Sequence, residues 1–385
     1  MKLCFICREY PPGPHGGIGT MTQVLARALV RAGHEVRSIG LYPSWYEAPE
    51  RQDDQGVQVL RLRQREHPLG WIASRYQLYR QISEWIRGGE VDVVELPDYQ
   101  GLAAGWNALD APVIVRMHGS LTYFSEELSQ PKEKKAFWLE RASLKRADFL
   151  ASVCRYTAEM TGKVFQIPMK PVEILYNPVE TPPAATEISR RANQVVFSGT
   201  LTGKKGIVSL IQAWRHVAKA APEAELHVFG KDGRAEDGGS MQEFLCSLVN
   251  GERPSIHFHG HVNRQQLFEA YRAAGVAVFP SYAEAFAVAP LEAMAVGCPT
   301  IFSDRGSGPE LLTHERQGLL VNPDKPEDIA TSILRVLRNP SFARAIGEAG
   351  RERVQRVFSV DRLVTQNESF YDRCLREFKT RTKGH

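Results

Sequence analysis

Two glutamates, eight positions apart, are the side chains whose spacing first indicates chemistry. Glu284 and Glu292 lie in segment 281–297, which follows a short apolar run. One helix face could carry both, but Pro290 is tolerated only in the first turn of a helix. We therefore predict Glu284 in a loop and Glu292 about one turn into a helix. A carboxylate accepts hydrogen bonds from neighbouring hydroxyls of a sugar or ribose, and amides at a helix start favour a diphosphate.

Two glycine-containing loops add candidate anion sites. Loop 11–19 (PPGPHGGIG) precedes a helical pattern, and its glycines permit close approach of the backbone to a ligand. Its order differs from the G-x-G-x-x-G of nicotinamide sites, which argues against that cofactor. Loop 197–206 (FSGTLTGKKG) carries Lys204 and Lys205 just before a second helical pattern, where a lysine can neutralise a phosphate. Taken alone, each loop is equally typical of a tight turn between a strand and a helix.

Asp98 and Tyr99 directly follow the apolar run 91–96. Ligands of open α/β sheets bind at the carboxyl ends of strands, so these two residues are candidate contacts of a second substrate. A turn with a packed tyrosine is an equally good interpretation.

Metal chemistry receives less support from the sequence. His257, His259 and His261 alternate, as metal ligands on a strand would, but no carboxylate or cysteine is grouped nearby, so we expect core and turn histidines. The chain also contains no D-x-D triplet, which argues against a metal-bridged diphosphate.

Short apolar runs alternate with helical patterns along the chain, which is typical of βαβ units and parallel sheets. The alternation breaks at residues 178–193, a segment with three prolines and no apolar periodicity that we interpret as a linker. The predicted fold is α/β, with doubly wound domains at 1–177 and 194–359 that face each other across a cleft where ligands bind.

Composition excludes several protein classes. The 385 residues have a net charge of only +4, which argues against a dedicated nucleic-acid binder. Cys4 and Cys7 stand at an odd spacing on one predicted strand, so we expect core thiols of a reducing cytosol rather than a redox pair. No segment resembles a signal peptide or a membrane span, so we expect a cytoplasmic protein.

Segment 61–87 holds six arginines interleaved with four aromatic residues, Trp71, Tyr76, Tyr79 and Trp85. This pattern is typical of an amphipathic helix with its aromatic residues in the core. The alternative is a peripheral helix that meets a lipid-linked substrate at the inner face of a membrane.

Together these motifs resemble the family 4 retaining glycosyltransferases of the GT-B fold, over nearly the whole chain. The matching positions are residues 16–19 (GGIG), 33–36 (GHEV), His118 with Gly119, Gly199 with Leu201, Lys205 and Gly206, residues 230–233 (GKDG), Glu284 with Glu292, and Glu310, Gly318 and Pro323. The resemblance implies two Rossmann-like domains, acceptor-side and donor-binding. It also implies a final helix, about 360–385, that crosses back to the N-terminal domain.

The resemblance also implies roles for single residues. Lys205 should stabilise the leaving diphosphate, Glu284 should bind hydroxyls of the transferred sugar, and His118 should contact that sugar near the reacting centre. Donor binding is expected at Gly16, Gly17, Gly199, Thr200, Lys204, Val262, Phe286, Ala287, Val288, Ala289 and Glu292. Within this set, Glu292 should hold the ribose, and the turn at His261 and Val262 should hold the base. The acceptor candidates are His15, Asp98 and Tyr99, and no metal or other cofactor is expected.

Thr200 departs from the family pattern, because many members have arginine at this position. Lys204, Arg116 or Arg8 should compensate, unless Lys205 and the helix amides suffice. The expected activity is metal-independent transfer of a hexose, with retention, from UDP-glucose to a saccharide or lipid-linked saccharide in exopolysaccharide or envelope polysaccharide biosynthesis. The alternatives are a GDP-mannose-dependent mannosyltransferase and, because of Thr200, a non-catalytic donor-binding regulatory subunit.

Overall fold

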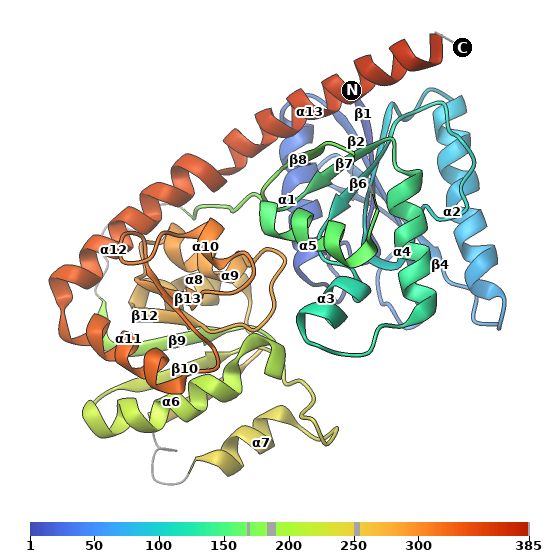
Figure 1. Ribbon diagram of the computed structural model, residues 1–385. Helices are drawn as coiled ribbons and strands as arrows, with labels where there is room; N and C mark the ends of the chain where they lie inside the picture. Colours follow the sequence, from blue (N-terminus) through green and yellow to red (C-terminus); the bar gives the residue numbers. More distant parts are fainter. Residues whose placement is uncertain (168–169, 183–189, 250–254, 384–385) are drawn as a thin grey trace. The chain divides into compact units, whose positions relative to one another are not determined.

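A computed structural model describes residues 1–167, 170–182, 190–249 and 255–383 (Figure 1). The chain forms two compact units, one of Met1–Pro178 with Val360–His385 and one of Val179–Ser359. Residues 183–189 of the segment predicted as a linker, 178–193, lie outside the described residues, and the second unit's first strand begins within that segment, at Arg191. Among the described residues, no helix is long and apolar enough to cross a membrane.

The first unit is built on an eight-stranded sheet in the order β3-β4-β2-β1-β5-β6-β7-β8, parallel except for the β3–β4 pair. Its strands are β1 (Lys2–Ile6), β2 (Glu35–Tyr42), β3 (Arg51–Asp54), β4 (Val57–Arg63), β5 (Val93–Pro97), β6 (Val113–Met117), β7 (Phe149–Ser152) and β8 (Val172–Ile174). Its helices are α1 (Gly17–Arg31), α2 (Gly70–Arg87), α3 (Leu121–Glu127), α4 (Lys134–Arg146), α5 (Arg155–Phe165) and α13 (Val360–Lys383), with a 3₁₀ turn, η1, at Tyr99–Gly101.

Both faces of this sheet are covered, which explains why its central strands read as continuous apolar runs. One face packs against α2, α4 and α5, and the other against α1 and α13. Cys4 belongs to the first of these cores and Cys7 to the second, so the prediction that they occupy opposite faces of one strand is confirmed. Both thiols are free, and burial raises the pKa of each to about 12.

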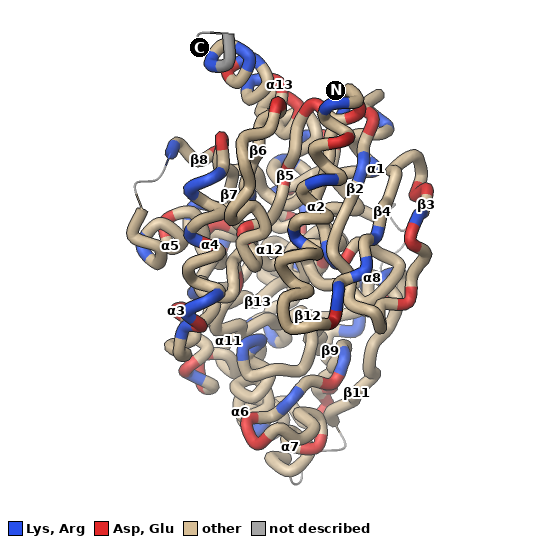
Figure 2. The backbone as a smooth tube through the Cα atoms, turned by 90° about the vertical axis from the view of Figure 1, so that its right-hand side faces the viewer, with Lys and Arg blue, Asp and Glu red and all other residues tan. Residues whose placement is uncertain are grey.

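The C-terminal helix α13 packs on the first unit through polar as well as apolar contacts. Its Tyr371 hydroxyl donates to Glu95 at 2.8 Å, and the buried Arg116 donates to the same carboxylate at 2.9 Å. Its solvent-facing residues carry both signs of charge along the helix (Figure 2). The chain thus returns to its first unit after completing the second.

The second unit contains a six-stranded parallel sheet in the order β11-β10-β9-β12-β13-β14. Its strands are β9 (Arg191–Ser198), β10 (Glu225–Phe229), β11 (Ile256–Gly260), β12 (Ala274–Phe279), β13 (Thr300–Ser303) and β14 (Leu319–Val321). Its helices are α6 (Ile207–Ala220), α7 (Met241–Leu248), α8 (Arg264–Ala273), α9 (Val288–Ala295), α10 (Gly308–Leu311), α11 (Pro326–Arg338) and α12 (Pro340–Arg353), with a 3₁₀ turn, η2, at Gly203–Lys205 and a π-helical turn, η4, at Val354–Phe358. The main core lies between the sheet and helices α6, α7 and α11.

Candidate functional site

In the second unit, parallel strands bring their following loops to one edge of the sheet. The Gly199 amide donates to the Phe229 carbonyl at 2.9 Å, and the Gly230 amide donates to the Gly260 carbonyl at 2.8 Å. Gly230 has φ +146°, and a Cβ there would lie 1.9 Å from the Gly199 carbonyl oxygen. These contacts require a glycine and hold the loops after β9, β10 and β11 side by side.

Lys205 and Glu284 meet at this edge, with Nζ and Oε1 2.5 Å apart. Two contacts fix the lysine loop against the end of β12. Gly206 adopts φ +70°, where a Cβ would lie 1.8 Å from the Pro280 carbonyl oxygen, and the Tyr282 amide donates to the Lys204 carbonyl at 2.8 Å. A cation and a carboxylate are therefore held together by two loops that are distant in the sequence.

The surroundings keep Glu284 ionised. Burial acts to raise the pKa of its carboxyl, but the charges of Lys205 and Lys204, with hydrogen bonds from Lys205 and Ser281, outweigh burial and lower that pKa. Ser281 Oγ donates to Glu284 Oε1 at 3.1 Å. The carboxylate is thus an acceptor for hydroxyl groups, and the ammonium beside it can face an anion.

Glu292 lies one turn into α9, while Glu284 lies in the preceding loop, so the positions predicted from Pro290 are confirmed. Arg264 donates to Glu292 Oε1, with Nε at 3.0 Å and Nη2 at 2.9 Å. Burial raises the pKa of Glu292, and Arg264 offsets only part of that effect. Because both contacts go to Oε1, Oε2 has no partner among the residues that the structure describes.

Arg264 is a residue that the sequence analysis missed. It opens α8 two positions after Val262, which was named as a contact for the base. It also forms an ion pair with Glu180. A basic residue directly after the predicted base-binding turn was the signal that could have identified it.

The start of α9 presents backbone groups at the same edge. Its N-cap, Ala287, makes no side-chain cap hydrogen bond, and Val288 and Ala289 form its first turn. Phe286 is buried and packs edge-on against Phe358, with ring centroids 6.0 Å apart. Anions are favoured at such a helix start because its first amides lack partners within the helix.

In the first unit, Asp98 and His118 lie together at the ends of β5 and β6. Asp98 Oδ1 accepts a hydrogen bond from the His118 backbone amide at 2.9 Å, and Oδ2 has no partner among the described residues. Burial raises the pKa of Asp98 to about 7. Burial, followed by the charge of Arg116, lowers the pKa of His118 to about 3. Its imidazole is therefore neutral near pH 7, when it can both donate and accept a hydrogen bond.

Glu9 is a second residue that the sequence analysis missed. Its Oε1 accepts a hydrogen bond from the Gly19 amide at 2.9 Å, within the first turn of α1. A diphosphate placed at Gly16 and Gly17 would therefore meet a carboxylate. Glu9 lies three residues after the end of β1, so the strand-end argument that identified Asp98 could also have found it.

Two acceptor candidates of the first unit differ in exposure. His15 is exposed, and its Nδ1 lies 2.8 Å from the Gly13 carbonyl oxygen. Tyr99 is half-buried, and burial raises the pKa of its hydroxyl, an effect that the charge of Arg8 opposes. Arg8 therefore lies near Tyr99.

The expectation that Arg116 compensates for Thr200 is wrong. The Arg116 side chain is fully buried and is bound by Glu95, Asn367 and Tyr371, so no ligand can reach it. Thr200 is exposed and Lys204 is half-buried. Of the three residues predicted to compensate for Thr200, Lys204 and Arg8 remain as candidates.

The histidine expectation also needs correction. His227 and Glu225 on β10 lie beside His257 on β11, with their ligand atoms within 4.8 Å of one another. A carboxylate is therefore grouped with these histidines, although none is near them in the sequence. His261 follows β11 and is exposed.

Segment 61–87 divides into a buried and an exposed part. Arg61 is buried and donates to the Pro11 carbonyl at 2.8 Å, while Tyr79 and Trp85 pack against the core. The amphipathic-helix interpretation is confirmed for Tyr79 and Trp85, which lie in α2, but not for Arg61, which lies in β4. Trp71 and Tyr76, however, are 38% and 64% exposed.

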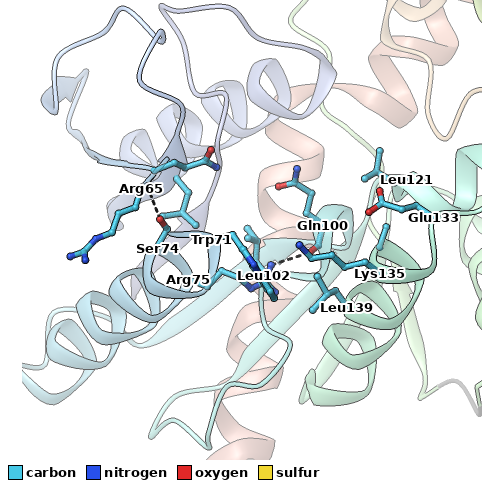
Figure 3. A pocket seen from close by; sticks show the side chains of 13 residues that line it. Arg65, Trp71, Ser74, Arg75, Gln100, Leu102, Leu121, Glu133, Lys135 and Leu139 are labelled. Carbon is cyan, nitrogen blue, oxygen red and sulfur yellow. Dashed lines mark hydrogen bonds between the residues drawn. The ribbon is translucent and has the colours of Figure 1, made fainter. Parts of the chain in front are cut away.

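A pocket of about 250 Å³ lies beside Trp71 in the first unit (Figure 3). Lys135 Nζ lies 3.9 Å from the centroid of the Trp71 ring. Arg75 donates to the Gln100 and Gly101 carbonyls, and burial lowers its pKa to about 10. No carboxylate pairs with Arg75 among the described residues. The sequence analysis did not predict this pocket.

Comparisons with known proteins match both units. A family model described as Glycosyltransferase Family 4 matches residues 15–182, and one described as Glycosyl transferases group 1 matches residues 180–353. An uncharacterized glycosyltransferase of Methanocaldococcus jannaschii is 28% identical, over 96% of this chain and 98% of that protein.

Solved structures match the whole fold. Sucrose-phosphate synthase of Thermosynechococcus elongatus has a TM-score of 0.80 and 21% identity, covering 96% of this chain and 98% of that one. HepE of Anabaena, solved in complex with UDP and glucose, has a TM-score of 0.74 and 15% identity, covering 97% and 99%. Each unit therefore matches a glycosyltransferase family model, and the chain has the two-sheet GT-B fold of these solved structures throughout.

Proposed function

We propose that the protein transfers a hexose, with retention and without a metal ion, from UDP-glucose to a saccharide or lipid-linked saccharide in exopolysaccharide or envelope polysaccharide biosynthesis. The observation that carries the proposal is the Lys205–Glu284 pair at the carboxyl edge of the second unit's sheet. HepE, which shares the fold, was solved with UDP and glucose, which supports a UDP-sugar as the donor.

Each donor group has a matching protein group in this proposal. The Lys205 ammonium and the amides at the start of α9 stabilise the charge that develops on the β-phosphate, as fixed donors do in a site from which water is excluded. Glu284 accepts hydrogen bonds from hydroxyls of the hexose. Glu292 Oε2 accepts a hydrogen bond from a ribose hydroxyl, while Arg264 donates to Oε1.

The transfer step breaks the bond between the anomeric carbon and the β-phosphate oxygen. The acceptor hydroxyl oxygen forms a new bond to that carbon on the same face, and its proton passes to the β-phosphate. Retention follows because attack and departure share one face. The neutral imidazole of His118 contacts the donor sugar, and Asp98 positions the His118 backbone through its 2.9 Å hydrogen bond.

The Trp71 pocket indicates an acceptor that carries negative charge. Three cationic side chains line it, Arg65, Arg75 and Lys135, against one carboxylate, Glu133. An aromatic face beside cations suits a sugar ring bearing a phosphate or carboxylate. The saccharide acceptor is therefore phosphorylated or otherwise acidic.

Contact with a membrane is a second property that one observation favours. Leu69, Ile72 and Tyr76 are 65%, 49% and 64% exposed around the start of α2. Exposed apolar residues near arginines are typical of a surface that meets anionic lipid. Co-sedimentation with anionic vesicles at low salt tests this property, and loss of binding in Ile72→Ser with Tyr76→Ser would support it; no binding by the wild type would exclude it.

Calorimetry with a donor panel tests the main proposal. UDP-glucose, UDP-galactose, UDP-N-acetylglucosamine and GDP-mannose are titrated with and without EDTA, and any slow hydrolysis of the donor is followed by NMR. Tightest binding of UDP-glucose with EDTA present, with the α-anomer appearing first, supports a metal-independent retaining enzyme. Tightest binding of GDP-mannose would identify GDP-mannose, instead of UDP-glucose, as the donor. Binding without turnover of any acceptor would favour a regulatory subunit.

A further inference from the structure

We propose that Glu225, His227 and His257 form a transition-metal site across β10 and β11, with His259 as a supporting hydrogen-bond partner of His227. The three side chains offer two imidazole nitrogens and one carboxylate oxygen within 4.8 Å of one another. His259 Nε2 lies 2.9 Å from His227 Nδ1, whereas Glu225 lies on the Nε2 side of the same ring, so a hydrogen bond from His259 can orient His227 as a ligand. The pairing of two strands brings these groups together.

Strand register explains the cluster. β10 and β11 are parallel, and His227 is the direct register partner of His257. Glu225 precedes His227 by two residues, and His259 follows His257 by two, so all four side chains share one face of the sheet. The His227 and His259 rings stack, with centroids 5.1 Å apart, and the His227 and His257 rings are tilted by 33°, with centroids 4.9 Å apart.

This face is open to solvent, whereas the opposite face forms the core. Leu226, Val228 and Ile256 alternate with the ligands and are buried in the main hydrophobic cluster. Glu225, His227 and His257 are partly exposed, and β11 is the edge strand of the sheet. A metal ion can therefore reach the ligands without any movement of the core.

The ligand chemistry selects the class of metal. Imidazole nitrogens with one carboxylate suit Zn²⁺, Co²⁺, Ni²⁺ or Cu²⁺, whereas Mg²⁺ and Ca²⁺ prefer oxygen ligands. Metal–nitrogen bonds of about 2.0–2.1 Å place ligand atoms at separations that small rotations of these side chains can reach. Water would complete the coordination of a three-ligand site.

A metal here would tie the edge strand to its neighbour. β11 ends at Gly260, whose carbonyl accepts the Gly230 amide, and Val262 follows in the predicted base-binding turn. A bound metal should therefore stabilise the second unit and restrict the motion of this turn. The effect on the turn rests on the proposed donor function, whereas metal binding itself does not.

Cobalt titration of the full-length, tag-free protein tests the site. After dialysis against a chelator and removal of the chelator, Co²⁺ is added while visible d–d absorption is recorded, and Zn²⁺ is titrated by calorimetry. We expect one ion per chain, ligand-field bands of a site with nitrogen ligands, and displacement of Co²⁺ by Zn²⁺. This readout is independent of sugar transfer, so it distinguishes failure of the metal site from failure of the proposed function.

Variants identify the ligands. His257→Gln and His227→Gln should each weaken Zn²⁺ binding by more than about tenfold, because even loss of a supporting partner costs about 10–100-fold. His314→Gln is the matched control, because His314 is a half-exposed histidine beside an acidic residue, Glu315. Glu225→Gln, outside the core, provides a third variant if either histidine variant unfolds. Absence of stoichiometric binding, or equal affinity in His257→Gln and His314→Gln, would overturn the proposal.

Discussion

Lys205 and Glu284 are 79 positions apart in the chain, yet their side chains form a 2.5 Å contact between Nζ and Oε1. This ion pair fills the place where a diphosphate and a sugar hydroxyl would bind in the proposed enzyme. A donor would therefore replace the contact between the two residues with one contact to each. The pair keeps both charged groups compensated when no donor is bound.

Removal of the Lys205 ammonium should affect catalysis more than folding. We expect Lys205→Ala to lower kcat about 10²–10³-fold, the usual cost of deleting one fixed donor to a developing negative charge. The pKa of Glu284 should rise, because burial is then opposed by fewer positive charges. Kinetics and carboxyl titration by NMR measure both effects. Lys219→Ala, an exposed lysine in the last turn of α6, should change neither.

Loss of Arg264 should leave Glu292 buried without its cation. A fully buried pair that loses one partner costs about 3–5 kcal/mol, but the Arg264 side chain is 34% exposed, so we expect about 1–2 kcal/mol. Urea unfolding of Arg264→Ala measures this loss in the free energy of unfolding. Adding Glu292→Gln should recover most of it, because no buried charge then remains. Equal stability of the wild type and Arg264→Ala would contradict this assignment.

The contributions of Asp98 and His118 to the pH dependence of the free energy of unfolding should cancel. Between about pH 4 and 6.5, the folded pair holds one proton, on Asp98, because the pKa of Asp98 is about 7 and that of His118 about 3. The unfolded pair also holds one proton, on His118. Equal proton counts give no net slope from these two groups.

Single variants should reveal each half of this balance. Asp98→Asn removes the proton that Asp98 binds only in the folded state, so stability relative to the wild type should rise with pH between about 4 and 7. His118→Gln removes the proton that His118 binds only in the unfolded state, so relative stability should fall as pH rises from about 3 to 6.5. Each slope is at most about 1.4 kcal/mol per pH unit. Denaturant titrations across this range measure the slopes, and parallel curves for all three proteins would refute the assignment.

The Trp71 pocket should favour charged acceptors. Among saccharides assayed with UDP-glucose, phosphorylated ones should react better than their neutral counterparts. Lys135→Ala should raise the acceptor KM about tenfold, which corresponds to about 1.4 kcal/mol, and should leave donor affinity unchanged. Lys145→Ala is the control, because Lys145 is also exposed and lies on the same helix, α4. A preference for neutral acceptors would count against an anionic acceptor.

Local chemistry made part of this site predictable. Pro290 alone was enough to separate Glu284 from Glu292, because a proline is restricted to the first turn of a helix. The odd spacing of Cys4, in β1, and Cys7, directly after it, likewise placed them on opposite faces of the first sheet. Such rules depend only on a few neighbouring residues, so they do not require knowledge of tertiary contacts.

The missed residues depend on which strands become neighbours. The Glu225–His257 grouping arises only because β10 pairs with β11, and strand order is not encoded in any short motif. Arg116 was wrongly considered available because its contacts come from α13, which begins more than 240 positions later. Glu9 lies shortly after β1, where the rule that identified Asp98 also applies, and Arg264 lies beside the predicted base-binding turn.

The central claim is a donor site built around Lys205 that works without a metal ion. Calorimetry of UDP-glucose binding to the wild type and to Lys205→Ala, both with EDTA, tests it most directly. We predict saturable one-to-one binding to the wild type that survives EDTA and is weakened at least about tenfold in the variant, or by about 1.4 kcal/mol. Binding that disappears with EDTA, or that is equal in the two proteins, would contradict the claim.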